Sequence, residues 1–87
     1  MYTFKNAPYP NTNSWYREII FDADGEPVGE INEPTDSTAR NKIYNVCRFE
    51  PMQICNGTTK IPKVMRSFPT VSECKDYIHS GEFQPFN

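Results

Sequence analysis

Apolar strand-forming residues cluster in two stretches of the chain, and a turn sequence interrupts each stretch. The first, over residues 15–32, runs from WYREIIF through Asp24-Gly25 to a second apolar run. Aromatic and β-branched residues are typical of strands, and Asp-Gly tolerates the positive φ of a tight turn. The pattern therefore predicts a β-hairpin over residues 15–32. A two-residue loop and a bulged three-residue loop both fit residues 22–26, so the register there stays open.

The second stretch, over residues 42–68, repeats this outline around Asn56-Gly57, the strongest short sequence signal for a hairpin. A loop at these two residues predicts the cross-strand pairs Cys55–Thr58, Pro51–Pro62, Glu50–Lys63 and Phe49–Val64. An apolar pair and an opposite-charge pair in one register each stabilise a sheet by about 0.2–1 kcal/mol. Because both prolines fall at one level, we expect an interrupted ladder and a projecting tip at residues 52–61.

The same register predicts how the side chains of this hairpin divide between its two faces. One face is expected to carry Cys47, Phe49, Val64 and Phe68, and the other to carry Arg48, Glu50 and Lys63.

The last apolar pattern, FPTVSECKDYIHSGEF, has helical spacing. Thr70 and Glu73 form a capping-box sequence, in which the threonine oxygen accepts the Glu73 amide and the glutamate reaches back to the threonine amide. Val71, Cys74 and Ile78 follow at i, i+3 and i+7 as an apolar stripe. We predict a helix over residues 70–80. It is too short to be stable alone and must pack on the sheet.

Three segments have weaker patterns. Residues 1–14 begin like a strand and then contain two prolines, which fits a short strand, an arm over the fold or a frayed terminus. In the break between the hairpins, Asp36 is a candidate cap for a short helix near residues 37–42. The tail, residues 82–87, carries two phenylalanines that either pack back or reach a partner.

These elements predict one α+β domain over residues 1–87. It comprises a small antiparallel sheet of about four to five strands, built from two consecutive β-hairpins, with one C-terminal helix on one face. The sequence has no apolar run long enough for a membrane span and no signal-like leader. Its three cysteines are an odd number without a Cys-x-x-Cys pair. We therefore expect free thiols and a cytoplasmic protein, in the host cytoplasm if the protein is viral.

Residues suited to chemistry do not form a recognisable site. Cys47, Cys55, Cys74 and His79 lack the close ligand spacing of structural zinc, and the acidic segment around Asp24-Gly25 does not fit a calcium loop. The sequon at Asn56 requires a secreted chain, which leaves that stretch as a turn. An enzyme would need a reactive thiolate at Cys55 or Cys74. We expect no catalytic residues, no metal and no cofactor.

Charge is segregated along the chain, although the net charge is only −2. Residues 17–36 contain seven acidic residues and one basic residue, whereas residues 40–66 contain six basic residues and one acidic residue. Two neighbouring hairpins would neutralise each other, or the charges form a bipolar surface that steers a partner.

Without a catalytic constellation, the sequence favours a non-enzymatic protein-interaction module. We expect an intracellular inhibitor or adaptor of a larger protein, such as a phage or mobile-element accessory protein. Binding is expected through the hairpin tips and aromatic termini, because aromatic and arginine residues dominate interface hot spots. The candidate contact residues are Trp15, Tyr16, Asp22, Asp24, Glu26, Arg48, Lys60, Lys63 and Arg66. The alternative is nucleic-acid binding by the basic ribbon over residues 40–66. The oligomeric state stays open.

Overall fold

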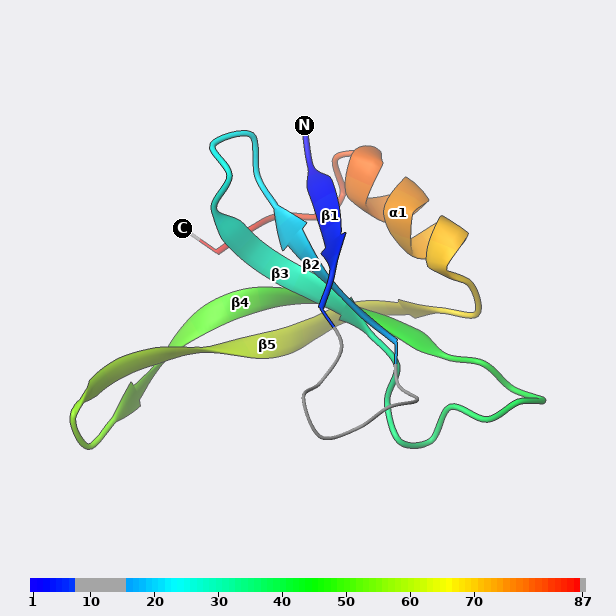
Figure 1. Ribbon diagram of the computed structural model, residues 1–87, viewed down its shortest axis with the longest axis horizontal. Coiled ribbons are helices and arrows are strands. Elements are labelled where there is room, and N and C mark those ends of the chain that lie inside the picture. The colour runs from blue at the N-terminus through cyan, green and yellow to red at the C-terminus, as the bar shows by residue number, and fades with distance from the viewer. Residues whose placement is uncertain (8–15, 87) are drawn as a thin grey trace.

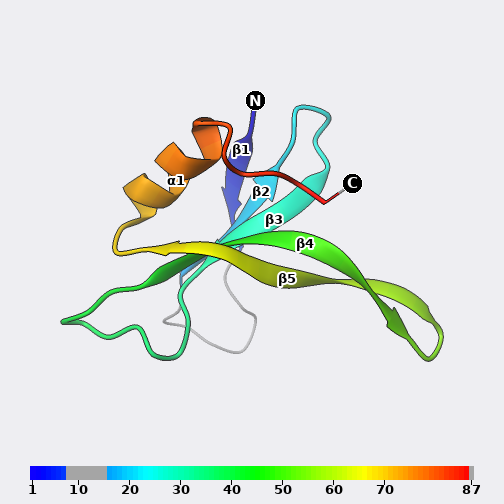
Figure 2. The same ribbon diagram turned by 180° about the vertical axis from the view of Figure 1, so that it is seen from behind.

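The computed structural model of the chain describes residues 1–7 and 16–86. Its elements in chain order are β1 (Thr3–Asn6), β2 (Arg17–Phe21), β3 (Pro27–Asn32), β4 (Tyr44–Ile54), β5 (Gly57–Phe68) and α1 (Val71–His79). The strands form one antiparallel sheet whose spatial order equals the chain order, and α1 lies against one face of it (Figures 1 and 2). The predicted α+β fold, with two successive hairpins and a C-terminal helix, is confirmed.

The core lies between α1 and the sheet face that α1 covers. Its buried residues come from the three central strands, the helix and the tail: Ile20, Ile31, Val46, Cys74, Ile78 and Phe83. Phe83 is 1% exposed, and its ring meets the ring of Tyr2 edge-on with 5.5 Å between the centroids. The tail therefore packs back on the fold through Phe83, whereas Phe86 is 48% exposed.

The turn of the first hairpin is the bulged three-residue loop, one of the two alternatives that the sequence allowed. The Asp22 N–H donates to the Glu26 carbonyl at 2.9 Å, and the Gly25 N–H donates to the Asp22 carbonyl at 3.1 Å. Gly25 has φ +82°, the left-handed conformation that this kind of turn requires at its last position. The Asp22 side chain also accepts the Asp24 and Glu26 amides, so it stabilises the turn that contains it.

The predicted register of the second hairpin is wrong by two residues. The loop is Cys55-Asn56, and Ile54 pairs with Gly57. Phe49 consequently faces Pro62 instead of Val64, and Lys63 faces Arg48 instead of Glu50. Among the described residues only glycines have positive φ, and Gly57 is one of them at +140°. The observed loop lies one position before the predicted one, which changes each cross-strand pair by two residues. In this loop Asn56 does not adopt the left-handed conformation, which is unfavourable for a residue with a side chain.

The ladder of this hairpin is continuous through both prolines, so the predicted interruption there is also wrong. Pro51 faces Lys60 and Pro62 faces Phe49, and both prolines lie inside uninterrupted strands. A proline fits a ladder only where its nitrogen faces away from the partner strand. The pairs Pro51–Lys60 and Phe49–Pro62 are two residues apart along the ladder. Hydrogen-bonded and non-hydrogen-bonded pairs alternate along an antiparallel ladder, so these two pairs are of the same type. Both prolines therefore occupy positions of the same, non-donating type.

The predicted division of side chains between the two faces is right except for Phe68. A shift of two residues leaves every side chain on its predicted face, so Cys47 and Phe49 still share a face with Val64. The register then shifts by one residue between Val46 and Cys47. This bulge puts Phe68 on the opposite face, where it packs against the core.

The helix begins as predicted, at a threonine cap. The Thr70 hydroxyl accepts the Glu73 N–H at 3.2 Å and donates to the Glu73 carboxylate at 2.8 Å. Cys74 and Ile78 point into the core. The helix ends at His79 with Ser80 as its C-cap, and Gly81 follows with φ +90°, as at many helix C-termini. No helix within residues 1–7 and 16–86 has the length and hydropathy to cross a membrane.

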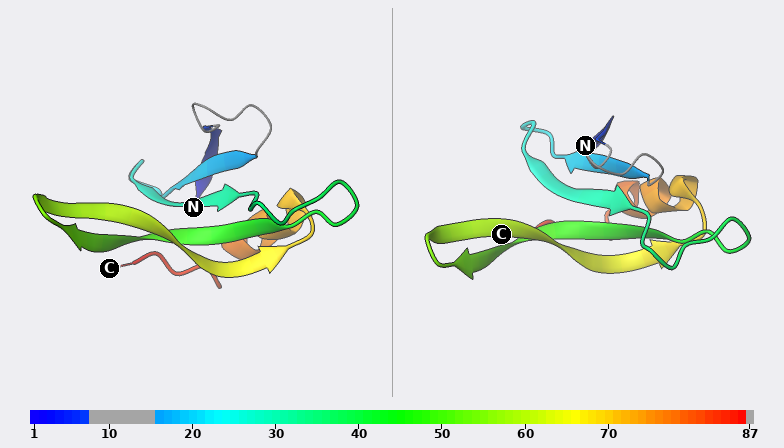
Figure 3. Two further views of the ribbon diagram at one scale, coloured as in Figure 1. Left: turned by 90° about the horizontal axis from the view of Figure 1, so that it is seen from below. Right: turned by 60° about the horizontal axis from the view of Figure 1, so that its bottom comes forward.

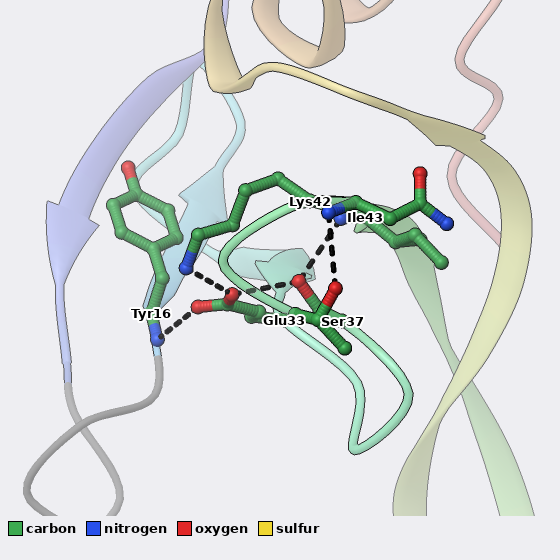
Figure 4. Close-up of polar contacts among 7 residues, drawn as sticks. Tyr16, Glu33, Ser37, Lys42 and Ile43 are labelled. Atoms are coloured by element: carbon green, nitrogen blue, oxygen red, sulfur yellow. Dashed lines mark hydrogen bonds and ion pairs between the residues drawn. The ribbon is translucent and has the colours of Figure 1, made fainter.

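The short helix predicted near residues 37–42 is not formed. The Glu33 carboxylate instead accepts hydrogen bonds from Ser37 Oγ at 2.7 Å, Lys42 Nζ at 2.9 Å and the Tyr16 N–H at 3.5 Å (Figure 4). Ser37 Oγ in turn accepts the Ile43 N–H at 3.0 Å. Side chains thus satisfy the backbone of this loop and compete with a helix there. The hydrogen bond from Lys42 is the main cause that lowers the pKa of Glu33.

Candidate partner-binding arm

The outer halves of β4 and β5 extend beyond the rest of the sheet. Strand β3 pairs with residues 45–48 of β4. Past Arg48, each strand of the hairpin has only the other as a paired neighbour among residues 1–7 and 16–86. Every residue from 51 to 64 is exposed. We call residues 51–64 the arm. Figure 3 shows it as a twisted ribbon that reaches past the other strands, which confirms the predicted projecting tip at residues 52–61.

Apolar side chains lie uncovered on the arm. The exposed fractions are 44% for Met52, 45% for Ile54, 38% for Ile61 and 53% for Val64. Met52 and Ile54 alternate along β4, and Ile61 faces Glu50, so these three apolar side chains share one face of the arm. Val64 lies on the other face. An exposed apolar cluster on a projecting element is typical of an interaction site.

The charges of the arm are all positive. Lys60 and Lys63 are its only ionisable side chains of either sign besides Cys55. Lys63 is 64% exposed and lies on the face of Ile61, with its Nζ 3.9 Å from the Glu50 carboxylate at the base of the arm. Lys60 projects from the opposite face. The arm therefore combines an apolar face with a local charge of +2.

The two arginines among the predicted contact residues lie at the base of the hairpin and already have intrachain contacts. Arg48 Nε donates to the Glu50 carboxylate at 2.7 Å, and Arg48 also donates to the Gln84 carbonyl at 3.3 Å. The guanidinium of Arg66 lies over the rings of Phe68 and Tyr77, at 5.3 Å and 5.6 Å from their centroids.

The remaining predicted contact residues lie elsewhere on the molecule. Tyr16 is half-buried and packs edge-on against Tyr44, with ring centroids 5.7 Å apart. Asp24 and Glu26 are exposed in the β2–β3 turn, close to Asp22, whose side chain accepts the amides of that turn. Trp15 lies outside the described residues. The predicted set thus divides into an acidic turn, the basic arm and residues that support the fold.

Ion pairs neutralise part of the charge that is segregated along the sequence. They link Arg17 to Glu30, Lys42 to Glu33, Lys75 to Glu18 and Arg48 to Glu50. Strands β3 and β4 are neighbours, as mutual neutralisation of the two hairpins requires. Lys63 also approaches Glu50, at 3.9 Å, whereas Lys60 forms no ion pair within residues 1–7 and 16–86.

The apolar residues of the arm are not among the predicted contact residues, because those were selected by charge and by aromatic or arginine character. The alternation of Met52 and Ile54 was visible in the sequence. Because a shift of two residues leaves the faces unchanged, the predicted register already put both on the face of Ile61.

The cysteines do not form a reactive or metal-binding cluster in the part of the chain that the structure describes. Burial raises the pKa of Cys47 and of Cys74 to about 12, so both remain thiols at neutral pH. Cys55 lies exposed in the turn at the end of the arm.

The class that the fold defines is a small α+β protein with a five-stranded antiparallel sheet and one covering helix. Comparison with protein-family models, curated proteins and solved structures found no match for this chain.

Proposed function

We propose that the protein is a non-enzymatic protein-interaction module, an inhibitor or adaptor, and that the arm is its principal binding element. The observation that carries this proposal is that residues 51–64 are all exposed although Met52, Ile54 and Ile61 gather on one face. An isolated two-stranded ribbon has little stability of its own. Here the ribbon continues out of a five-stranded sheet, which holds it in position for contact with a partner.

The chemistry of the arm supports a partner surface that is apolar with an acidic rim. Complete burial of an aliphatic side chain contributes roughly 1.5–3 kcal/mol, and each of the three is about two-fifths exposed, so covering all three contributes on the order of 2–4 kcal/mol. Lys60 and Lys63 add attraction to acidic groups, which mainly speeds association and selects the partner.

The same proposal places the protein in the cytoplasm, as an accessory protein of a phage or mobile element. The support is chemical: all three cysteines are free, as is usual in a reducing compartment.

The test is affinity capture from a lysate of the source cells, or of the host for a viral protein. The wild type is compared with the double variant Ile54→Thr/Ile61→Thr, which makes one face of the arm polar. The matched control is Val64→Thr, the same kind of substitution at a residue that is 53% exposed on the other face. We expect a stoichiometric partner with the wild type and the control, and its loss with the double variant. Capture of no partner, or equal capture by all three proteins, would count against the arm.

Nucleic-acid binding by the ribbon has weaker support. Arg48 and Arg66 have intrachain contacts, and Lys60 and Lys63 point to opposite faces. Phosphate contacts release counterions, so binding would weaken steeply with salt. If nucleic acid is retained, and Lys60→Gln/Lys63→Gln reduces the slope of log affinity against log salt by about two, this alternative replaces our proposal.

A further inference from the structure

A second surface lies at the other end of the molecule from the arm. It is a shallow groove of about 330 Å³ between α1 and the end of β5. The side chains that define its chemistry are Arg66, Phe68, Glu73, Asp76, Tyr77 and Glu82. Phe68 and Tyr77 provide aromatic surface, with ring centroids 5.5 Å apart.

The groove is acidic. Three carboxylates line it against one guanidinium, and Arg66 lies over the two aromatic rings. Glu73 accepts the helix-capping hydroxyl of Thr70, and Glu82 accepts the hydroxyl of Ser80. Within residues 1–7 and 16–86, none of the three carboxylates forms an ion pair. The groove therefore has a formal charge of −2, equal and opposite to that of the arm.

We propose that the arm of one molecule binds in the acidic groove of a second copy of this chain. The inference rests on the proposed role of the arm as a binding element and names its partner. Lys63 and Ile61 share a face of the arm, so the lysine is placed to reach the carboxylates while the isoleucine packs on the aromatic rings. Lys60, on the opposite face, meets acidic groups at the rim.

The positions of the two surfaces determine what kind of assembly results. The molecule measures 41 Å along its longest axis, and the arm extends to one end of this axis while α1 and the end of β5 lie toward the other (Figures 1 and 2). The arm therefore cannot reach the groove of its own chain. A contact between two different surfaces is head-to-tail, and it adds further copies unless the rotation closes a ring.

Sedimentation velocity of the full chain, over a range of protein and salt concentrations, tests the proposal. We expect the average mass of the wild type to rise with protein concentration at low salt and to fall as salt is added. Charge reversal on the arm, Lys60→Glu/Lys63→Glu, or in the groove, Asp76→Lys/Glu82→Lys, should weaken association by at least about tenfold, because each juxtaposes like charges. Glu73 is left unchanged because it caps α1.

An equimolar mixture of the two charge-reversed proteins is the decisive measurement. Each reversed arm meets a reversed groove in the mixture, so association should return, which also shows that both variants are folded. A wild type that stays monomeric at low salt at every concentration overturns the proposal, as does a mixture that stays monomeric. If the wild type is monomeric but captures an unrelated protein through its arm, this inference fails and the proposed function stands.

Discussion

Phe83 is the side chain by which the C-terminal tail contributes to the fold. It lies on a segment without regular secondary structure, yet it is 1% exposed and contacts Tyr2, the residue before β1. Replacing it with alanine removes a buried ring and leaves a cavity in the core cluster that also contains Ile20, Ile31 and Ile78. Phe86 is the matched control, because it is the same residue type on the same tail and is 48% exposed.

The magnitude follows from the burial. Phenylalanine-to-alanine changes in cores cost about 3–5 kcal/mol, and the edge-on contact with Tyr2 accounts for roughly 0.5–1.5 kcal/mol of that loss. A domain of 87 residues has a free energy of unfolding of about 4–13 kcal/mol. Phe83→Ala therefore removes a large part of the stability. Phe86→Ala loses a contact with the Arg48 guanidinium, 5.8 Å from the ring, which contributes about 0.5–1 kcal/mol.

Urea unfolding followed by circular dichroism measures both variants. With a slope of about 1 kcal/mol per molar urea, typical of small domains, Phe83→Ala lowers the midpoint by roughly 3 M or unfolds the protein outright. Phe86→Ala lowers it by less than about 1 M. Equal midpoints for the two variants would refute the conclusion that the tail is part of the core.

Three further substitutions or treatments have defined outcomes. Gly29→Ala should destabilise the protein by about 1–3 kcal/mol or more, because a Cβ there overlaps the carbonyl oxygen of Cys47 on the neighbouring strand. Urea unfolding measures this change, and an unchanged midpoint would contradict the close approach of the two strands. Glu33 has a lowered pKa in the folded state, so its contribution to stability is present above its ordinary value of 4.5 and is lost as the pH falls through the folded pKa. Glu33→Gln should therefore show a smaller loss of stability than the wild type between neutral pH and pH 3, and parallel profiles would contradict this. At neutral pH a thiol reagent should modify Cys55 rapidly, and Cys47 and Cys74 only on unfolding. Mass spectrometry of the native protein measures this, and early labelling of either buried cysteine would contradict the prediction.

The architecture was predictable from the sequence because each element has its own local signal. The periodicity, the threonine cap and the two turn sequences lie within a few residues of the elements that they define. The register of the second hairpin was not predictable, because Cys55-Asn56 and Asn56-Gly57 both give loops of two residues. A tight Asn56-Gly57 loop would need a positive φ at Asn56 as well as at Gly57, and among the described residues only glycines adopt one. The faces were still right where the register differs by two, since side chains alternate with a period of two.

The parts of the site that depend on distant contacts were not predictable. Arg48 is held by the carbonyl of Gln84, 36 residues away, and Arg66 lies over a tyrosine of the helix. The sequence around Arg48 and Arg66 does not predict either contact. The loop after β3 shows the same limit, because its Asp36 resembles a helix cap while Glu33 and Lys42 fix the chain in another conformation through tertiary hydrogen bonds.

The two prolines of the arm indicate how it makes contact. Beyond Arg48, no other described strand pairs with the outer edges of the hairpin. Such unpaired edges can form hydrogen bonds with strands of other molecules. Pro51 lies on one edge and Pro62 on the other, each with its nitrogen facing outward, so each edge lacks a donor near its middle. A partner strand added at either edge would leave an acceptor unpaired. Recognition is therefore expected through the faces of the ribbon, where Met52, Ile54 and Ile61 supply apolar contact and the lysines supply charge.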